Sequence, residues 1–161
     1  MNAKKENPVQ SFYGNKLRVR VCGICVHDEK LLFVNHSSIT DSNFWAPPGG
    51  GLNFGERAQD CLKREFMEET GIEIEVHNFL FACELIKNQL HGIELFFKVK
   101  PITFQTKIGN DPEVGSPSII KNVEFKSWDE IQKIPHNELH GIFAHVTHPS
   151  KIDKLLGYFM L

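Results

Sequence analysis

The sequence lacks the features that mark membrane, secreted or nucleic-acid-binding proteins. None of its apolar runs approaches the ~20 residues that span a bilayer, and its N-terminus is polar where a secretory signal has an apolar stretch. Neither charge is in excess, because 18 basic and 20 acidic side chains leave a net charge of −2. This balance argues against a nucleic-acid polymer or an anionic membrane as partner.

Disorder is also excluded by the composition, since 41% of the 161 residues are apolar and 24% are charged. We expect a soluble, cytoplasmic protein with a flexible lead-in over residues 1–16 and a single domain over residues 17–161.

Cysteine is scarce, with four residues at Cys22, Cys25, Cys61 and Cys83. Cys22 and Cys25 have the spacing of a metal or redox pair, but they lie in an apolar run typical of a strand. Residues three apart on a strand point to opposite faces, which disfavours one ion held by both. We expect buried, reduced thiols.

Strands and helices alternate in a way that predicts an α/β or α+β sandwich. A helix is predicted over 57–70, ending at Gly71, and apolar spacing predicts further helices around 139–146 and 152–159. The segment 105–118 has two prolines and two glycines, and we expect a long functional loop there. Strands are predicted over 17–26, 30–35, 72–85, 93–99 and 123–128.

The segment from Gly49 to Ile72 is where the sequence points to chemistry. A helix turns about 100° per residue, so Glu65, Glu68 and Glu69 share an arc of about 100° beside the apolar face. Such a cluster can be a merely solvated surface, but like charges at these spacings repel, and a position beside the core favours a bound counter-charge. Carboxylates suit Mg²⁺, and a glycine turn lets a phosphate approach the main chain. The geometry favours metal-assisted phosphate chemistry.

These residues resemble the signature of the Nudix hydrolase family. Gly50, Glu56, Arg64 to Phe66, Glu68 to Glu69 and Gly71 to Ile72 occur with the spacing of that signature, and every fixed position is filled. The resemblance implies an α/β/α sandwich with a mixed central sheet. It also implies a hydrolase that cleaves a pyrophosphate bond in a nucleoside diphosphate linked to another moiety, such as a nucleoside triphosphate or a nucleotide sugar.

The resemblance implies a divalent cation as cofactor, Mg²⁺ with Mn²⁺ as a possible substitute. Its ligands would be Glu65, Glu68, Glu69 and the carbonyl oxygen of Gly50. Gly49 and Gly50, in the turn before the helix, would also bind the substrate.

The resemblance further assigns catalytic roles. Glu68 and Glu69 would take part in catalysis, and Arg64 would orient the carboxylates and pair with Glu56. The general base varies within the family, and two candidates stay open in this chain: Glu69 in the helix and Glu113 in the long loop.

The sequence offers fewer candidates for the basic side chains that bind phosphate. Many relatives end the second strand with a basic residue, whereas this sequence has Asn35 and His36. Arg18 and Arg20 share one face of the first strand and are candidates to bind substrate, the alternative being a solvent-facing strand charge. Histidines also crowd residues 136–148, where ordinary structural histidines are favoured over a zinc site.

Two alternatives to hydrolysis stay open. One is a catalytically silent Nudix module that binds a nucleotide, although the intact signature argues against it. The other is an isomerase-like reaction on a diphosphate substrate. As partners we expect a small nucleotide substrate and a possible homodimer, because many relatives pair.

Overall fold

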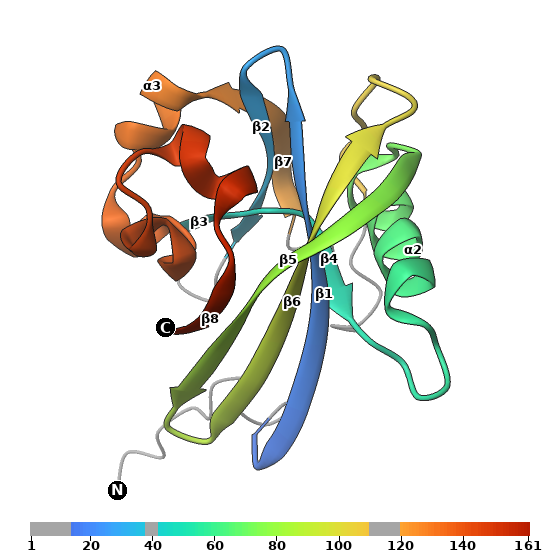
Figure 1. Ribbon diagram of the computed structural model, residues 1–161, viewed down its shortest axis with the longest axis vertical. Coiled ribbons are helices and arrows are strands. Elements are labelled where there is room, and N and C mark those ends of the chain that lie inside the picture. Colours follow the sequence, from blue (N-terminus) through green and yellow to red (C-terminus); the bar gives the residue numbers. More distant parts are fainter. Residues whose placement is uncertain (1–13, 38–41, 110–119) are drawn as a thin grey trace, which may run out of the picture.

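The architecture is a mixed β-sheet covered on both faces by helices. A computed structural model describes residues 14–37, 42–109 and 120–161 of the chain. The long helix α2 (Ala58–Thr70) lies against one face, and short C-terminal helices cover the other (Figure 1). The predicted sandwich with a mixed central sheet is confirmed.

The sheet is built around strand β1. It has the order β3-β2-β1-β6-β5-β8, with β4 paired to β1 and β7 paired to β2. β1 runs parallel to β6 and antiparallel to β2 and β4, while β5 is antiparallel to β6 and parallel to β8. The strands are β1 (Lys16–His27), β2 (Lys30–Ser37), β3 (Asn43–Ala46), β4 (Gly49–Gly51), β5 (Ile74–Lys87), β6 (Leu90–Pro101), β7 (Ile120–Ser127) and β8 (Gly157–Met160).

Helix α2 begins after Arg57 and ends where the sequence predicts. Gly71 adopts a left-handed conformation (φ 69°) that residues with a side chain rarely take, and its N–H donates to the carbonyl of Met67. The buried face of α2 carries Leu62 and Phe66, which pack on Val21, Cys25 and other residues of one core.

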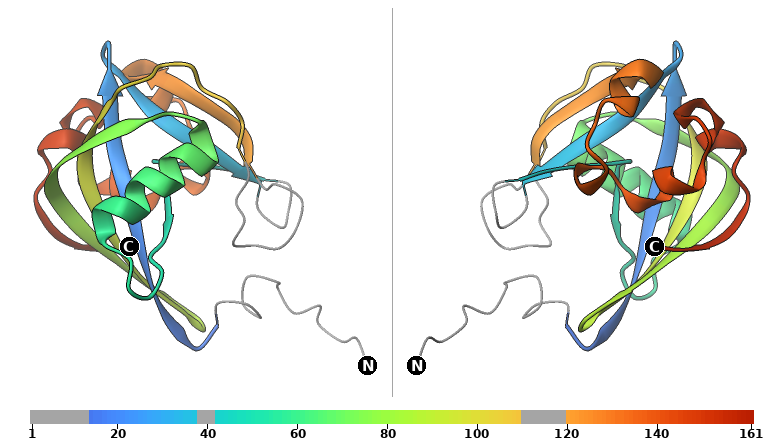
Figure 2. Two further views of the ribbon diagram at one scale, coloured as in Figure 1. Left: turned by 90° about the vertical axis from the view of Figure 1, so that its right-hand side faces the viewer. Right: turned by 90° about the vertical axis from the view of Figure 1, so that its left-hand side faces the viewer.

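The opposite face of the sheet holds the second core, and Figure 2 shows the C-terminal segment lying across it. That core contains Cys22, which confirms that Cys22 and Cys25 point to opposite faces. All four cysteines are free and buried. The elements on this face are α3 (Trp128–Gln132) and the 3₁₀ helices η2 (His136–Glu138), η3 (Gly141–His145) and η4 (Pro149–Lys154).

The prediction of C-terminal helices around 139–146 and 152–159 is wrong. Residues 141–145 and 149–154 form short 3₁₀ helices, and residues 157–160 form strand β8 beside β5. Pro149 and Gly157 (φ 122°) interrupt any longer helix. The apolar residues still face the core, because Ile142 and Ile152 are fully buried and Phe159 packs edge-on against Phe81.

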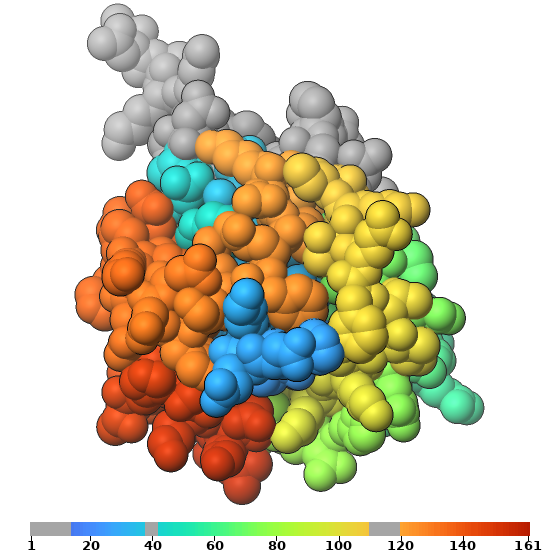
Figure 3. All heavy atoms as spheres, turned by 90° about the horizontal axis from the view of Figure 1, so that it is seen from above, coloured from blue at the N-terminus to red at the C-terminus, as the bar shows by residue number. Residues whose placement is uncertain are grey.

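The top of the molecule brings distant segments together. The turn between β1 and β2 lies between the C-terminal segments on one side and the segment after β6 on the other (Figure 3). None of the helices in the described ranges is long and apolar enough to cross a membrane. Most of the expected lead-in, residues 1–13, lies outside the described residues.

Candidate active site

Helix α2 carries the three predicted glutamates toward the sheet. Glu65 and Glu69 are each only 2% exposed, whereas the side chain of Glu68 is 31% exposed at the edge of the site. The alternative of a solvated helix face therefore fails for Glu65 and Glu69. Buried carboxylates require compensating partners, because an isolated buried charge is strongly destabilising.

Arg64 supplies several of those partners at once. Its Nε and Nη2 donate to the two carboxylate oxygens of Glu56 at 2.9 and 3.0 Å. Its Nη1 donates to Glu65 Oε1 at 2.6 Å and to Glu68 Oε2 at 3.0 Å, and Nη2 also reaches the carbonyl of Gly51 at 3.1 Å. The hydrogen bonds from Arg64 lower the pKa of Glu56 to about 2. The predicted Arg64–Glu56 pair is thus present, and Arg64 fixes two further carboxylates.

The predicted glycine turn is a short strand, β4, that runs along β1 beneath the glutamates. The N–H of Gly49 donates to Glu69 Oε2 at 2.9 Å. A Cβ added at Gly50 would lie 2.2 Å from the carboxylate of Glu65, so only glycine leaves room for that side chain. This close approach places the main chain of β4 against both buried glutamates.

His36, near the end of β2, lies next to Glu69. The distance from His36 Nε2 to Glu69 Oε1 is 3.9 Å. Burial, together with the nearby charge of Arg20, lowers the pKa of His36 to about 3, so the imidazole is neutral at physiological pH. The preceding Asn35 is structural, since its amide bonds the side chain of Asn43 at 3.0 Å.

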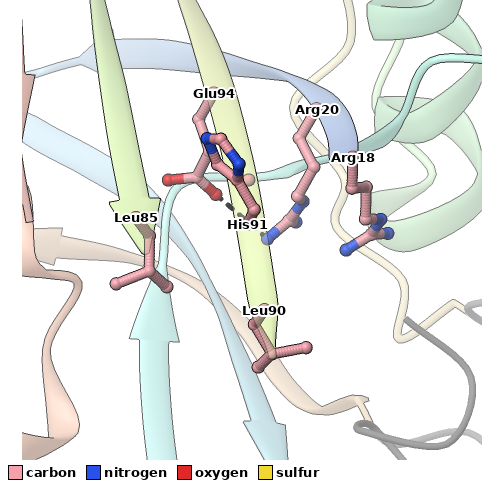
Figure 4. Close-up of a pocket in the computed structure, with 7 residues that line it drawn as sticks. Arg18, Arg20, Leu85, Leu90, His91 and Glu94 are labelled. Atoms are coloured by element: carbon pink, nitrogen blue, oxygen red, sulfur yellow. Dashed lines mark hydrogen bonds and ion pairs between the residues drawn. The ribbon is translucent and has the colours of Figure 1, made fainter. Parts of the chain in front are cut away.

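Arg18 and Arg20 line a pocket of about 140 Å³ on the face of the sheet opposite α2. Arg20 is not a solvent-facing strand charge, because its Nη1 donates to Glu94 Oε1 at 3.2 Å and its Nη2 to the carbonyl of Gly49 at 2.6 Å. Figure 4 shows the Arg20 guanidinium directed toward Glu94. The pocket is lined by Arg18, Arg20, Leu85, Leu90, His91, Gly92 and Glu94.

From the sequence, Glu94 was not expected at the site, and His140 stood out there only as one of the crowded histidines of residues 136–148. Glu94 Oε2 lies 2.7 Å from His140 Nε2, and both residues are buried. Burial alone would raise the pKa of Glu94, but the contacts with His140 and Arg20 outweigh it and lower the pKa to about 2. The available sequence signal was Glu94 as the one charged residue in the apolar run 93–97.

Two further histidines of residues 136–148, His145 and His148, have partners of their own. His145 Nε2 contacts the carbonyl of Met160 at 3.2 Å, and His148 Nδ1 contacts the hydroxyl of Ser150 at 2.8 Å. His148 also caps η4 by accepting the Ser150 N–H. These contacts give the histidines structural roles in the C-terminal segment.

A divalent cation fits the chemistry of the glutamate cluster. Within the described ranges no three His, Cys, Asp or Glu side chains already converge on one point, since Glu65 and Glu68 turn toward Arg64 and Glu69 toward Gly49. The donors are nevertheless oxygen atoms, which hard cations prefer, and one guanidinium is shared by three negative charges. The other predicted base, Glu113, lies outside the described residues.

Comparison with known proteins places the chain in a family. The NUDIX domain family model matches residues 16–145. The chain therefore belongs to the Nudix hydrolase family, which confirms the resemblance seen in the sequence.

Individual relatives share parts of the chain. It is 43% identical over 44 residues to an RNA pyrophosphohydrolase of Bartonella clarridgeiae, which covers 27% of this chain and 25% of that protein. It is 27% identical over 118 residues to an ADP-ribose pyrophosphatase of Methanocaldococcus jannaschii, which covers 72% and 65%. The chain thus spans less than two thirds of either relative.

A solved structure shares the fold. The structure of a NUDIX hydrolase from Nitrosomonas europaea superposes with a TM-score of 0.68 and covers 89% of this chain and 78% of that one. Their sequence identity is 17%, so this likeness concerns the fold.

Proposed function

We propose that this protein hydrolyses a pyrophosphate bond in a small nucleotide or nucleotide conjugate, with Mg²⁺ as cofactor and Mn²⁺ as a substitute. The observation that carries the proposal is the arrangement of Glu65 and Glu69. Both are buried, and both lie against the glycine strand β4, where Gly50 leaves room for the Glu65 carboxylate.

The metal ligands would be Glu65, Glu68, Glu69 and the carbonyl oxygen of Gly50. These are the hard oxygen donors that Mg²⁺ takes from proteins, with substrate phosphate oxygens and water completing its shell. When bound, the cation supplies charge neutralisation for the pyrophosphate oxygens and acidifies water. Arg64 holds Glu65 and Glu68 on one side of the site, so these two carboxylates do not have to be ordered during turnover.

The general base is proposed to be Glu69, with Glu113 as the alternative. Glu69 Oε2 is bound to the N–H of Gly49, while Oε1 faces the neutral imidazole of His36. One oxygen is thus fixed by the main chain, which orients the other to accept a proton from an attacking water. Proton transfer to a positioned carboxylate commonly contributes about 10²–10⁴-fold to the rate.

The substrate's remaining moiety is proposed to occupy the pocket lined by Arg18 and Arg20. These guanidinium groups suit phosphate oxygens, and Leu85 and Leu90 supply an apolar side. The relatives' names cover RNA and ADP-ribose, two different substrate classes. Because the protein has a net charge of −2, we propose a small molecule as its partner rather than a nucleic-acid polymer or a membrane.

A substrate panel tests the proposal. Purified protein is incubated with Mg²⁺ or Mn²⁺ and with canonical and oxidised nucleoside triphosphates, ADP-ribose, NADH, nucleotide sugars, dinucleoside polyphosphates or 5′-triphosphate RNA, and products are separated by chromatography. Metal-dependent cleavage of a small-molecule class supports the proposal and names the leaving group. Rearrangement of the substrate without release of phosphate would indicate an isomerase. Nucleotide binding without turnover would indicate a catalytically silent module. Cleavage of RNA alone would contradict the proposed small substrate.

Substitution of the two candidate bases then locates the proton acceptor. Glu69→Gln is expected to lower kcat by about 10²-fold or more, with Glu113→Gln less affected. Asp60→Asn is the matched control, because Asp60 lies exposed in the first turn of the same helix. A larger loss in Glu113→Gln would transfer the base to the loop, and near wild-type turnover in Glu69→Gln would remove Glu69 from the mechanism.

We also propose that the protein acts in the cytoplasm, because its four cysteines are free and the cytoplasm keeps thiols reduced. A homodimer is proposed as its assembly. Light scattering on the purified chain tests this, and a monomeric mass at assay concentration would refute it.

A further inference from the structure

A continuous chain of four polar contacts links the C-terminal segment to the catalytic helix. His140 Nε2 lies 2.7 Å from Glu94 Oε2, and Glu94 Oε1 accepts from Arg20 Nη1 at 3.2 Å. Arg20 Nη2 donates to the carbonyl of Gly49 at 2.6 Å, and the N–H of Gly49 donates to Glu69 Oε2 at 2.9 Å. The contacts cross four elements and end on the proposed general base.

Two of the residues in this series of contacts use both terminal atoms of their side chains. Glu94 accepts from His140 with one oxygen and from Arg20 with the other, and Arg20 donates to Glu94 and Gly49 from different nitrogens. Glu94 is 8% exposed, so its charge is taken out of water and depends on these two partners. A planar fork also fixes direction, which a single-point contact does not.

His140 is oriented by the backbone around it. Its N–H donates to the carbonyl of Trp45 at 2.9 Å, and its Nδ1 accepts the N–H of Ile142 at 3.3 Å. Because Nδ1 accepts, Nε2 is the ring nitrogen that donates to Glu94.

Both backbone polar groups of Gly49 are hydrogen-bonded to side chains. Its carbonyl accepts from Arg20, and its N–H donates to Glu69. A change in the direction of Arg20 is therefore passed to the orientation of Gly49, and from there to the Glu69 carboxylate. Arg20 and Glu94 also line the pocket, so a bound substrate would contact the same pair (Figure 4).

We propose that Glu94 is a positioning residue, oriented by His140, that acts through Arg20 on Gly49 and so places the Glu69 carboxylate. Its catalytic consequence rests on the proposed hydrolase function. Its structural consequence, the ordering of the Gly49 N–H, can be measured without any substrate or metal.

Three variants of the full chain separate this role from a general loss of charge. Glu94→Gln keeps the shape, but an amide has one acceptor oxygen and cannot accept from both Arg20 and His140. Arg20→Lys keeps the positive charge but loses the fork, so it cannot hold Glu94 and Gly49 in the same geometry. The double variant tests whether Glu94 acts through Arg20.

The control is Glu84→Gln. Glu84 also makes a short contact with a histidine, His91, at 2.6 Å and a further hydrogen bond to Tyr158. It lies on β5 and takes no part in the four contacts between His140 and Glu69. It matches the chemical change at Glu94 without touching Arg20 or Gly49.

The primary readout is hydrogen exchange of the Gly49 amide by NMR on the substrate-free protein. We expect exchange about tenfold faster in Glu94→Gln and in Arg20→Lys, no further increase in the double variant, and wild-type exchange in Glu84→Gln. The parallel readout is kcat, expected to fall about tenfold in both single variants without adding in the double one.

Unchanged Gly49 exchange in Glu94→Gln, or additive effects in the double variant, would overturn the proposal. A raised KM with unchanged kcat and unchanged exchange would make Glu94 a substrate contact instead, which also overturns it. If the wild type cleaves nothing in the panel while Gly49 exchange responds as expected, the hydrolase function fails and the positioning role stands.

Discussion

Replacing Gly50 by alanine tests the placement of the buried glutamates with a single methyl group. The added Cβ would lie 2.2 Å from both Cδ and Oε2 of Glu65. Gly50 is not among the glycines with positive φ, so alanine adopts its backbone without strain. The carbonyl oxygen proposed as a metal ligand is retained, and the perturbation falls on the Glu65 carboxylate.

The size of the effect follows from this distance. Non-bonded carbon and oxygen atoms do not approach closer than about 3.2 Å, so the carboxylate has to retreat by about 1 Å. A displacement of about 1 Å in a catalytic group can cost about 10²-fold in rate. Because Glu65 also leaves its 2.6 Å contact with Arg64, we expect a loss of about 1–3 kcal/mol in the free energy of unfolding.

The assay compares kcat on the substrate found by the panel, Mn²⁺ affinity by electron paramagnetic resonance, and urea unfolding. Gly141→Ala is the control, because its Cβ would meet Leu161 at 3.5 Å, an ordinary contact. We expect Gly50→Ala to fold but to bind Mn²⁺ weakly and turn over about 10²-fold more slowly. A displacement of about 1 Å predicts a loss of about 10²-fold, so activity and Mn²⁺ affinity within about threefold of wild type would show that the Glu65 carboxylate is not needed in its observed place.

Three further substitutions probe an ion pair, a helix cap and the core. Glu56 has a pKa of about 2 against an ordinary 4.5, so its pairing with Arg64 stabilises the fold fully above pH 4.5, and this stabilisation is lost as the pH falls toward 2. The free energies of urea unfolding of Glu56→Gln and wild type should therefore converge over that range, and a constant difference between them would refute the pairing. Ser127→Ala removes the capping box of α3, in which Ser127 and Glu130 bond each other's backbone N–H, and should cost about 1 kcal/mol in thermal unfolding with kcat unchanged. Phe66→Ala empties a fully buried position of the core beneath α2 and should cost about 3–5 kcal/mol by denaturant titration, whereas a loss below 1 kcal/mol would mean that the core refills.

Helix α2 could be predicted because its signals are local. Apolar spacing, the glutamates and the terminating Gly71 all fall within 57–71, and the structure places α2 there. The Arg64–Glu56 pair was predictable for the same reason, since the two residues are close in sequence and the family signature names both. The burial of Glu65 and Glu69 followed from their position beside the apolar face.

The C-terminal segment could not be predicted in this way. Its apolar residues have helical spacing, but the requirement on them is only to reach the core, which an irregular chain with 3₁₀ helices also meets. Strand β8 forms because its backbone finds an unpaired edge of β5, and that edge lies over 70 positions earlier in the chain. Tertiary pairing overrides local periodicity here.

The polar residues behind the site show a different limit of sequence reasoning. Glu94 is separated by 46 residues from His140 and by 74 from Arg20, so no spacing rule connects them. Each alone has an ordinary explanation: a strand charge, one histidine among several, or a surface arginine. Their connection appears only in the fold, where the parallel pairing of β1 and β6 puts Arg20 beside Glu94 and the C-terminal segment brings His140 to Glu94. A carboxylate isolated in an apolar strand is therefore a reason to look for a distant cation and for what that cation holds, which in this protein is the carbonyl of Gly49.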